Sequence, residues 1–348
     1  MNDNSYGEGV GQLVLDSIDN CVGQFVPDIL FEQLVKEYSN ARRILGPRLI
    51  RLLTGFEMDD IERNARYPEF ARTLKDNLLK NVERLRNAEI IDEHGVLTEK
   101  AVECAGVELL KSAEQEVFGE PSKRISRQGE EKDLRKYRSG DYYKDVNIPA
   151  TIREVTRNNA QLDYSSLIVN NKVLSKGCQI IFALDASISM RGEKISVGKK
   201  AGASLALRAM NNKDRVGVVV FGTDIKESIA PSLVLKDVLH ALVRARPSTQ
   251  TDIARTILYS SSLFSFSGKK HLVIITDAFP TIGAEDDVIE EVSKAGKLGI
   301  TITVIGIDVD AHGRMLAEKM ALLGNGKFYI AESISDIPTL VLQDYGLL

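Results

Sequence analysis

Apolar residues at helical spacing occupy the first part of this chain, up to about residue 120. Before that point apolar side chains recur three and four positions apart, as at Leu30, Phe31 and Leu34. This spacing places them on one face of a helix, where they can be buried against neighbouring helices. Residues 1–120 are therefore predicted to form a helical N-terminal domain.

A short stretch inside the predicted helical domain, residues 90–98, departs from the helical spacing. Its sequence, IIDEHGVLT, has two apolar runs around an acidic His-Gly turn, which is typical of a hairpin. One interpretation makes residues 80–115 a winged-helix-like element that binds DNA. The other makes the stretch a loop between two helices, and we favour it because no clearly basic recognition helix precedes the turn.

Residues 121–174 are predicted to be a charged connector that packs onto the domain following it. The stretch 121–145 is dense in charge, Gly and Ser and poor in aliphatic residues, which is typical of a solvated segment. Arginines and tyrosines interleave there, for example Arg135, Tyr137 and Tyr142, and such a pattern would also suit stacking on RNA. Charge runs are usually solvated faces, so we favour the connector over a nucleic-acid contact.

From about residue 175 to residue 345, short apolar runs alternate with segments of helical spacing. That alternation is typical of a parallel sheet with helices on both faces. The predicted fold is a doubly wound α/β domain of the Rossmann-like type, with a mainly parallel sheet and one edge strand. Strands are predicted at residues 179–184, 216–221, 226–229 (the edge strand), 271–276, 301–307 and 327–330. Helices are predicted at residues 193–210, 235–243, 253–262, 288–298, 313–323 and 334–342.

Polar side chains follow two of the predicted strands at the points where those strands end. Asp185, Ser187 and Ser189 follow the first strand directly, and Asp277 follows the fourth. Thr251 lies in a polar loop that opens a helix. Ligands of open α/β sheets bind outside the carboxyl ends of the strands, so these five side chains are expected to converge at one edge.

The five side chains offer two carboxylates and three hydroxyls, without an imidazole or a thiolate. Such an all-oxygen set suits Mg²⁺ or Mn²⁺ rather than zinc, and Mg²⁺ keeps waters that a carboxylate of another protein can replace. Taken singly, Ser187 and Ser189 would also serve as helix caps, Thr251 as an N-cap and Asp277 as a turn residue. Their joint order along the chain favours a shared metal site.

Together Asp185, Ser187, Ser189, Thr251 and Asp277 resemble the metal-ion-dependent adhesion site (MIDAS) of von Willebrand factor A (VWA) domains. Integrin I domains and magnesium-chelatase D-type subunits share that site. The resemblance covers residues 175–345, and the segments IGIDVD and GNGKFYIAES are similar to the end of such a domain. The chain departs from the family pattern in having Ile188 in place of Gly or Ser and Ala278 in place of Gly. Neither departure removes an oxygen ligand.

Residues 137–153 are similar to a stretch that precedes the VWA domain in prokaryotic intracellular proteins paired with MoxR-type AAA+ ATPases. This resemblance implies an adaptor or co-chaperone for such an ATPase, in protein or metal-centre maturation, that acts through Mg²⁺-dependent protein–protein contacts. The sequence has no G-x-x-x-x-G-K-[ST] phosphate loop, and its four histidines show no pattern near the site, so no enzymatic activity is expected. The alternatives are a Ro-like RNA-binding VWA protein and a metal-dependent hydrolase.

Net charge, cysteine content and the length of apolar runs limit which partners and which cellular location are expected. The formal net charge of -4 argues against a strongly basic nucleic-acid binder. The three cysteines, Cys21, Cys104 and Cys178, lack metal-site spacing and are expected to be reduced thiols. The sequence shows no apolar run near the roughly 18 residues of a membrane helix and no apolar leader at its start, so a cytoplasmic protein without a membrane partner is expected.

Overall fold

The computed structural model of the chain comprises two compact units. One unit consists of residues 1–121 and 178–348, and the other of residues 122–177. Most of the predicted connector's charged run, together with Ala278, lies outside the residues whose structure is described. The described residues are 7–119, 134–137, 148–158, 166–170, 177–247, 250–265, 268–277 and 283–348.

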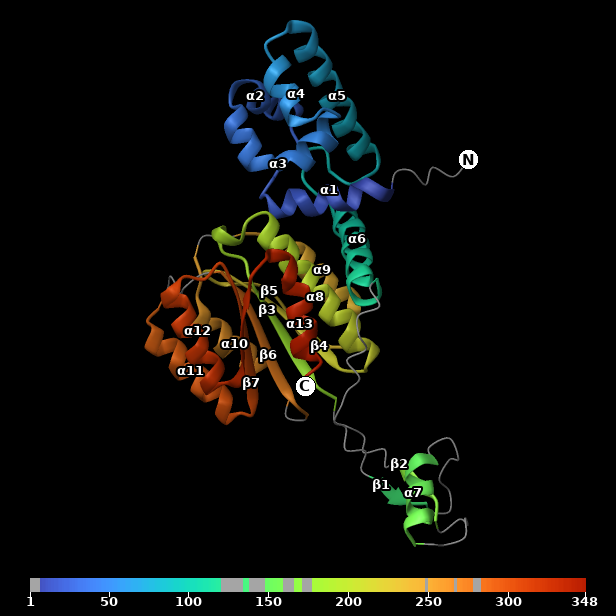
Figure 1. The fold of residues 1–348 in the computed structure, drawn as a ribbon. Coiled ribbons are helices and arrows are strands. Elements are labelled where there is room, and N and C mark those ends of the chain that lie inside the picture. The colour runs from blue at the N-terminus through green and yellow to red at the C-terminus, as the bar shows by residue number, and fades with distance from the viewer. Residues whose placement is uncertain are drawn as a thin grey trace. The chain divides into compact units, whose positions relative to one another are not determined.

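The N-terminal region is helical, as predicted (Figure 1). Leu30 and Leu34, one helical turn apart, are both buried, because the helix turns the same face to its neighbours at each. The helices within residues 7–119 are α1 (Gly7–Asp19), α2 (Pro27–Lys36), α3 (Tyr38–Thr54), α4 (Met58–Asn64), α5 (Pro68–Asn87) and α6 (Glu99–Phe118).

A tight turn joins α5 to α6 and contains the stretch that breaks the helical spacing. Ile91 and Leu97 pair in a single antiparallel bridge. The Asp92 carboxylate accepts the backbone N–H groups of His94 and Val96 at 2.9 Å and 2.8 Å, which closes the turn from inside. The segment is a loop between two helices with a short hairpin.

The C-terminal part is the predicted α/β domain, built on a six-stranded sheet in the order β5-β4-β3-β6-β7-β8. Neighbouring strands are parallel, except that β5 at the edge runs antiparallel to β4. The edge strand predicted at 226–229 is therefore present and longer. The strands are β3 (Gln179–Asp185), β4 (Arg215–Phe221), β5 (Ile225–Ser232), β6 (Lys270–Thr276), β7 (Ile300–Ile307) and β8 (Asn325–Ala331).

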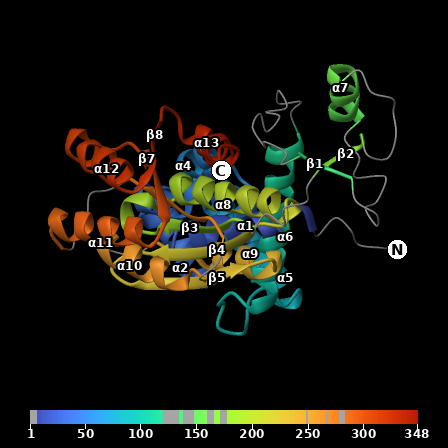
Figure 2. The same cartoon turned by 90° about the horizontal axis from the view of Figure 1, so that it is seen from below.

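Helices cover both faces of this sheet (Figures 1 and 2). Along β3, Ile180, Phe182 and Leu184 pack in one hydrophobic core, and Ile181 and Ala183 pack in the other. Both faces of the strand are buried, which is why it reads as one continuous apolar run. Helices α8 (Glu193–Asn211), α9 (Leu235–Arg244) and α13 (Ile337–Tyr345) contribute to the first core, and α10 (Ile253–Leu263), α11 (Glu285–Lys297) and α12 (Ala311–Leu323) to the second.

Two of these helices begin earlier than the apolar spacing predicted, because a side chain caps the first turn. Helix α11 begins at Glu285 rather than at residue 288, and the Asp287 carboxylate accepts the N–H of Ala284 at 3.0 Å. Helix α12 begins at Ala311 rather than at residue 313, since the Asp310 carboxylate accepts a backbone N–H of its first turn at 2.7 Å. Such caps satisfy amide groups that a helix start leaves free.

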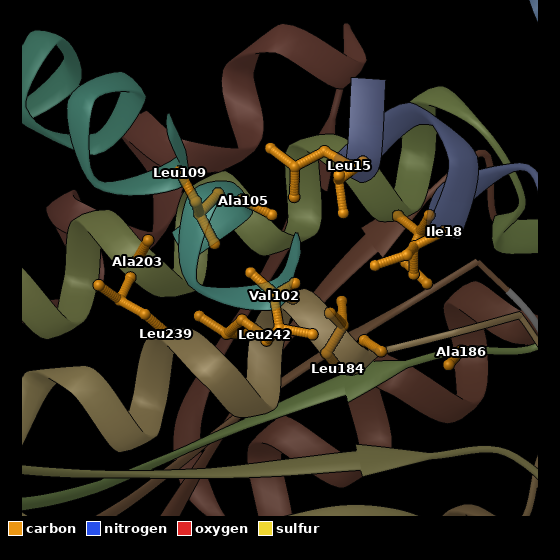
Figure 3. Packing of buried hydrophobic residues seen from close by; sticks show 14 of the residues in the cluster. Leu15, Ile18, Val102, Ala105, Leu109, Leu184, Ala186, Ala203, Leu239 and Leu242 are labelled. Atoms are coloured by element: carbon orange, nitrogen blue, oxygen red, sulfur yellow. The ribbon is translucent and has the colours of Figure 1, made fainter. Parts of the chain in front are cut away.

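The helical region and the α/β domain share one hydrophobic core. Val102, Ala105 and Leu109 on α6 belong to the same buried cluster as Leu239 and Leu242 on α9 (Figure 3). Fully burying one such Leu or Val side chain stabilises a fold by about 1.5–3 kcal/mol, so this contact adds substantially to the stability of both parts. The N-terminal helices are thus an integral layer of the larger unit.

The smaller unit contains a short antiparallel pair, β1 (Leu134–Lys136) and β2 (Ile168–Asn170), and helix α7 (Ile148–Asn158). The Thr151 hydroxyl on α7 accepts the N–H of Ile168 at 2.9 Å, which ties the helix to the pair. Among all the helices described, none combines the length and the apolar character that crossing a membrane requires.

Candidate metal site

The first component of the site is a fully buried carboxylate at the end of β3. Asp185 Oδ1 accepts the N–H of Ser187 at 2.7 Å, and Oδ2 accepts the hydroxyl of Thr276 at 2.6 Å. Thr276 is the last residue of β6, the parallel neighbour of β3. The ends of two adjacent strands therefore fix this carboxylate.

A chain of hydroxyls connects this end of β3 to the residue that follows β6. The Oγ atoms of Ser187 and Ser189 lie 3.0 Å apart, and Ser189 Oγ donates to Asp277 Oδ1 at 2.7 Å. The Asp277 side chain is 2% exposed, whereas Ser189 is exposed. Four of the five residues predicted from sequence thus form one hydrogen-bonded network, and the network opens to solvent at Ser189.

The fifth residue, Thr251, is fully buried at the same edge of the sheet. The N–H of Asp252 donates to Gly222 O at 2.9 Å, and the N–H of Ala186 donates to Phe221 O at 2.7 Å. The end of β4 therefore contacts both the loop after β3 and the residue beside Thr251. Asp252 caps α10 with its side chain, so Thr251 is not the N-cap that its position before the helix would allow.

The other structural alternatives for these residues also disagree with the contacts. Ser187 precedes a 3-10 turn (Ile188–Met190) without capping it through its side chain, and α8 begins only after Gly192. Asp277 accepts hydrogen bonds from side chains on other elements, namely Ser189 and Lys194. The arrangement has the character of a side-chain cluster rather than of unrelated helix caps.

Burial raises the pKa of Asp185 to about 6, although the hydrogen bonds from Thr276 and Ser187 lower it. The ionised form is disfavoured because the carboxylate is withdrawn from water and both of its partners are neutral. A cation among these oxygens would compensate that charge. The donor atoms are carboxylate and hydroxyl oxygens, the set that suits Mg²⁺ and Mn²⁺.

The hydroxyls are essential to any such role. Within the described residues, no three His, Cys, Asp or Glu side chains gather into a metal-binding group. A cation at this edge would therefore depend on Ser187 and Ser189 as well as on the two carboxylates. The described geometry thus fits a site with few charged ligands and vacant positions for water or for a partner.

Two charged residues that the sequence analysis missed complete the site. Lys194 Nζ lies 2.9 Å from Asp277 Oδ2 and 3.1 Å from Asp308 Oδ2. Burial lowers the pKa of Lys194, but the hydrogen bonds and charges of the two carboxylates outweigh that effect and raise it overall. Asp308 follows β7, so the same strand-end rule would have found it. Lys194 is on a helix, and no sequence spacing identifies it.

Residues 179–343 match the family model of the von Willebrand factor type A domain. A comparison with curated protein sequences gave no match. Similar solved structures include an aerotolerance-related membrane protein from Bacteroides fragilis, at 19% identity and a TM-score of 0.41, over 49% of this chain and 100% of that chain. Another is the conserved hypothetical protein BatB from Bacteroides thetaiotaomicron, at 19% identity and a TM-score of 0.43, over 49% and 98% of the two chains.

A third similar structure is proximal thread matrix protein 1 from the mussel byssus with a zinc-occupied MIDAS motif. It is 22% identical with a TM-score of 0.41, over 49% of this chain and 47% of that one.

Proposed function

Since residues 179–343 form a von Willebrand factor type A domain, we propose that this chain is a cation-dependent protein-interaction module. The observation that carries the proposal is the network from buried Asp185 through Ser187 and Ser189 to Asp277. Mg²⁺ or Mn²⁺ is the proposed cation, held by these four residues and Thr251. When bound, the cation supplies a Lewis-acidic position to which a partner's carboxylate can bind.

The proposed partner would bind at the exposed side of the network. Ser189 is exposed, and Ile188 beside it is 52% exposed, whereas Asp185 and Thr251 are fully buried. Among the described residues, the side of the 3-10 turn is therefore the exposed approach to the proposed cation. A single acidic side chain on a protruding surface fits this approach.

The proposed partner is an AAA+ ATPase of the MoxR type, for which the chain acts as an adaptor or co-chaperone in the cytoplasm. Support for this comes from the resemblance of residues 137–153 to the stretch that precedes such domains. The sequence also lacks a G-x-x-x-x-G-K-[ST] phosphate loop, so a partner would have to supply ATP hydrolysis. The maturation of a protein or a metal centre is the process that this pairing implies.

We propose binding rather than hydrolysis as the role of the site, because metal-assisted hydrolysis also needs a positioned base. His271 Nε2 lies 2.7 Å from Asp344 Oδ2, at the amino end of β6 and thus at the opposite end from Asp277. His312 pairs with Glu285 at 2.7 Å. These contacts support a structural role for both histidines.

Cation binding is the first test of the proposal. Isothermal titration of the full chain with Mg²⁺ and Mn²⁺ should show one site in wild type, and Asp185→Asn and Ser189→Ala should weaken it at least tenfold. Ser262→Ala, which removes an exposed serine hydroxyl from α10, is the matched control and should bind as wild type does. Equal affinity in all four proteins would overturn the proposed site.

Partner capture is the second test. Wild type immobilised in Mg²⁺ should retain an AAA+ ATPase from native lysate, identified by mass spectrometry. EDTA or Asp185→Asn should abolish that retention, whereas Ser262→Ala should keep it. Retention of the same proteins in every arm would contradict a cation-dependent interaction, and nucleic acid in the eluate would favour the RNA-binding alternative.

A further inference from the structure

The loop that carries Ser187 and Ser189 is attached at its far end to the helical region. The N–H of Gly192 donates to Asp19 O at 3.1 Å. The Arg191 guanidinium donates to the backbone oxygens of Asn20 and Ile44. The end of α1 and the middle of α3 therefore hold the residues that follow the 3-10 turn.

The backbone carbonyls of Asn20 and Ile44 can accept hydrogen bonds from Arg191 because both lie at local breaks in the helices. Helix α1 ends at Asp19, so the carbonyl of Asn20 lies beyond its last turn. In α3, Gly46 has non-helical φ/ψ angles and Pro47 follows it, which interrupts the helix just after Ile44. A planar guanidinium with several N–H donors can satisfy both acceptors at once.

A buried ion pair fixes the same end of α1 to α8. Lys199 Nζ on α8 donates to Asp19 Oδ1 at 2.5 Å and to Val243 O at 3.1 Å. The side chains of Lys199 and Asp19 are only 1% and 2% exposed. Such a pair requires both partners, because either one alone would be a buried, uncompensated charge.

The other end of the loop begins in the hydrophobic core to which α1 also contributes. Ile18 on α1 belongs to the same buried cluster as Leu184 and Ala186, the two residues that flank Asp185 (Figure 3). Asp185 accepts the N–H of Ser187, and the helical region holds Gly192. Six residues, 187–192, thus run between two fixed points and include all of the 3-10 turn.

We propose that Arg191 is a positioning residue through which the helical region holds the loop in its cation-binding conformation and so sets the cation affinity. The proposal rests on the cation site proposed above. A shift of Arg191 would be transmitted through the turn to Ser189, and through the start of α8 to Lys194. Because coupling between sites is reciprocal, cation binding must strengthen the contact with α1 by the same factor by which that contact strengthens cation binding.

Arg191→Met and Arg191→Lys in the full chain test this role. Mn²⁺ affinity should fall at least tenfold in Arg191→Met and less in Arg191→Lys, which keeps the charge but not the planar donor array. Hydrogen exchange of amides 187–194 should accelerate in the cation-free variants. Arg314→Met, on the exposed face of α12, is the matched control and should change neither quantity. Circular dichroism melts establish that each variant is folded.

Wild-type affinity and wild-type exchange in folded Arg191→Met would overturn the positioning role. If that variant does not fold, the same two measurements on Arg191→Lys decide the question. If wild type itself binds no cation, the proposed function fails, and the exchange of amides 187–194 in the cation-free proteins still tests whether Arg191 orders the loop.

Cys21 provides a reciprocal measurement on the helical side. Cys21 is an exposed residue whose thiol contacts Pro247 O at 3.9 Å, and it follows Asn20, whose carbonyl accepts from Arg191. Saturating Mn²⁺ should slow alkylation of Cys21 in wild type, as followed by peptide mass spectrometry, and should have no such effect in Arg191→Met. The same alkylation rate with and without Mn²⁺ in a wild type that binds the ion would contradict the coupling.

Discussion

Two buried aspartates lie near opposite ends of the same sheet, and they differ in the side chains that surround them. Asp344, at the amino end, receives His271 Nε2 at 2.7 Å and the hydroxyl of Thr303 at 3.2 Å. Asp185, at the carboxyl end, receives only neutral donors, the hydroxyl of Thr276 and the N–H of Ser187. A histidine can supply a positive charge to its carboxylate, whereas these neutral donors cannot.

The partners of the two carboxylates distinguish a structural cluster at Asp344 from a candidate binding site at Asp185. At Asp344 the fold itself supplies a histidine ring and a threonine hydroxyl as partners, and the Tyr329 hydroxyl also faces the carboxylate at 3.5 Å. Burial, together with the charge and hydrogen bond of Asp344, raises the pKa of Tyr329 to about 12. At Asp185 the compensation is left for a cation from outside. Burial alone therefore does not identify a functional carboxylate, and the nature of its partners does.

The largest expected effect is at the structural end. Asp344→Ala should lower the free energy of unfolding by about 3–5 kcal/mol, because it removes one partner of a buried pair and leaves His271 Nε2 without the other. Urea unfolding in EDTA measures the loss. A decrease under 1 kcal/mol would show that the pair does not contribute in the way its burial implies.

The opposite sign is expected at Asp185 when no cation is present. Its pKa is raised from 3.8 to about 6 in the folded protein, so wild type should lose stability as pH rises through that interval, by about 3 kcal/mol in total. Asp185→Asn cannot ionise and should avoid this loss. Urea unfolding in EDTA should show similar stabilities near pH 3.5 and a more stable variant above pH 6. A variant that is less stable than wild type above pH 6 would contradict the comparison.

Adding Mg²⁺ should nearly cancel that difference in stability. Ligand at 100 times its dissociation constant stabilises a folded protein by about 2.7 kcal/mol, so the Tm of wild type should rise with Mg²⁺. The Tm of Asp185→Asn, which is expected to bind the ion at least tenfold more weakly, should rise less. Differential scanning calorimetry at pH 7.5 measures both. An equal rise in the two proteins would place the bound cation elsewhere.

The smallest effect concerns the ammonium group beside the site. Lys194 donates to Asp277 and competes with a cation for that carboxylate, so Lys194→Met should raise Mg²⁺ affinity about tenfold, or about 1.4 kcal/mol. Lys294→Met, on α11, is the control and should leave the affinity unchanged. Weaker binding in Lys194→Met would mean that the ammonium assists the site instead.

The inner strands of the sheet were predictable because they are buried on both faces. Ile180 and Ile181, adjacent in β3, pack in different cores, so a continuous apolar run identified the strand. The first residues of the helices were less predictable. Asp287 and Asp310 cap α11 and α12 through local hydrogen bonds, which cannot be inferred from the spacing of apolar residues.

The arrangement of four site residues followed from strand ends alone, since parallel strands bring their carboxyl ends to one edge. Their proposed role as metal ligands stays a prediction, and so does the role of Thr251. The roles of Lys194 and Arg191 could not be predicted, because their contacts depend on how α8 and the helical region pack. The spacing of residues along the sequence does not reveal that packing.

The core that α6 shares with α8 and α9 has a consequence for the order in which the chain is synthesised. The ribosome completes α6 at Phe118, but α9 is complete only at Arg244. At usual translation rates the apolar face around Val102 and Leu109 remains uncovered for roughly ten seconds, until the helices that pack against it have been synthesised. During that interval the nascent chain exposes a face suited to chaperones, and the N-terminal layer acquires its partners only when translation is well advanced.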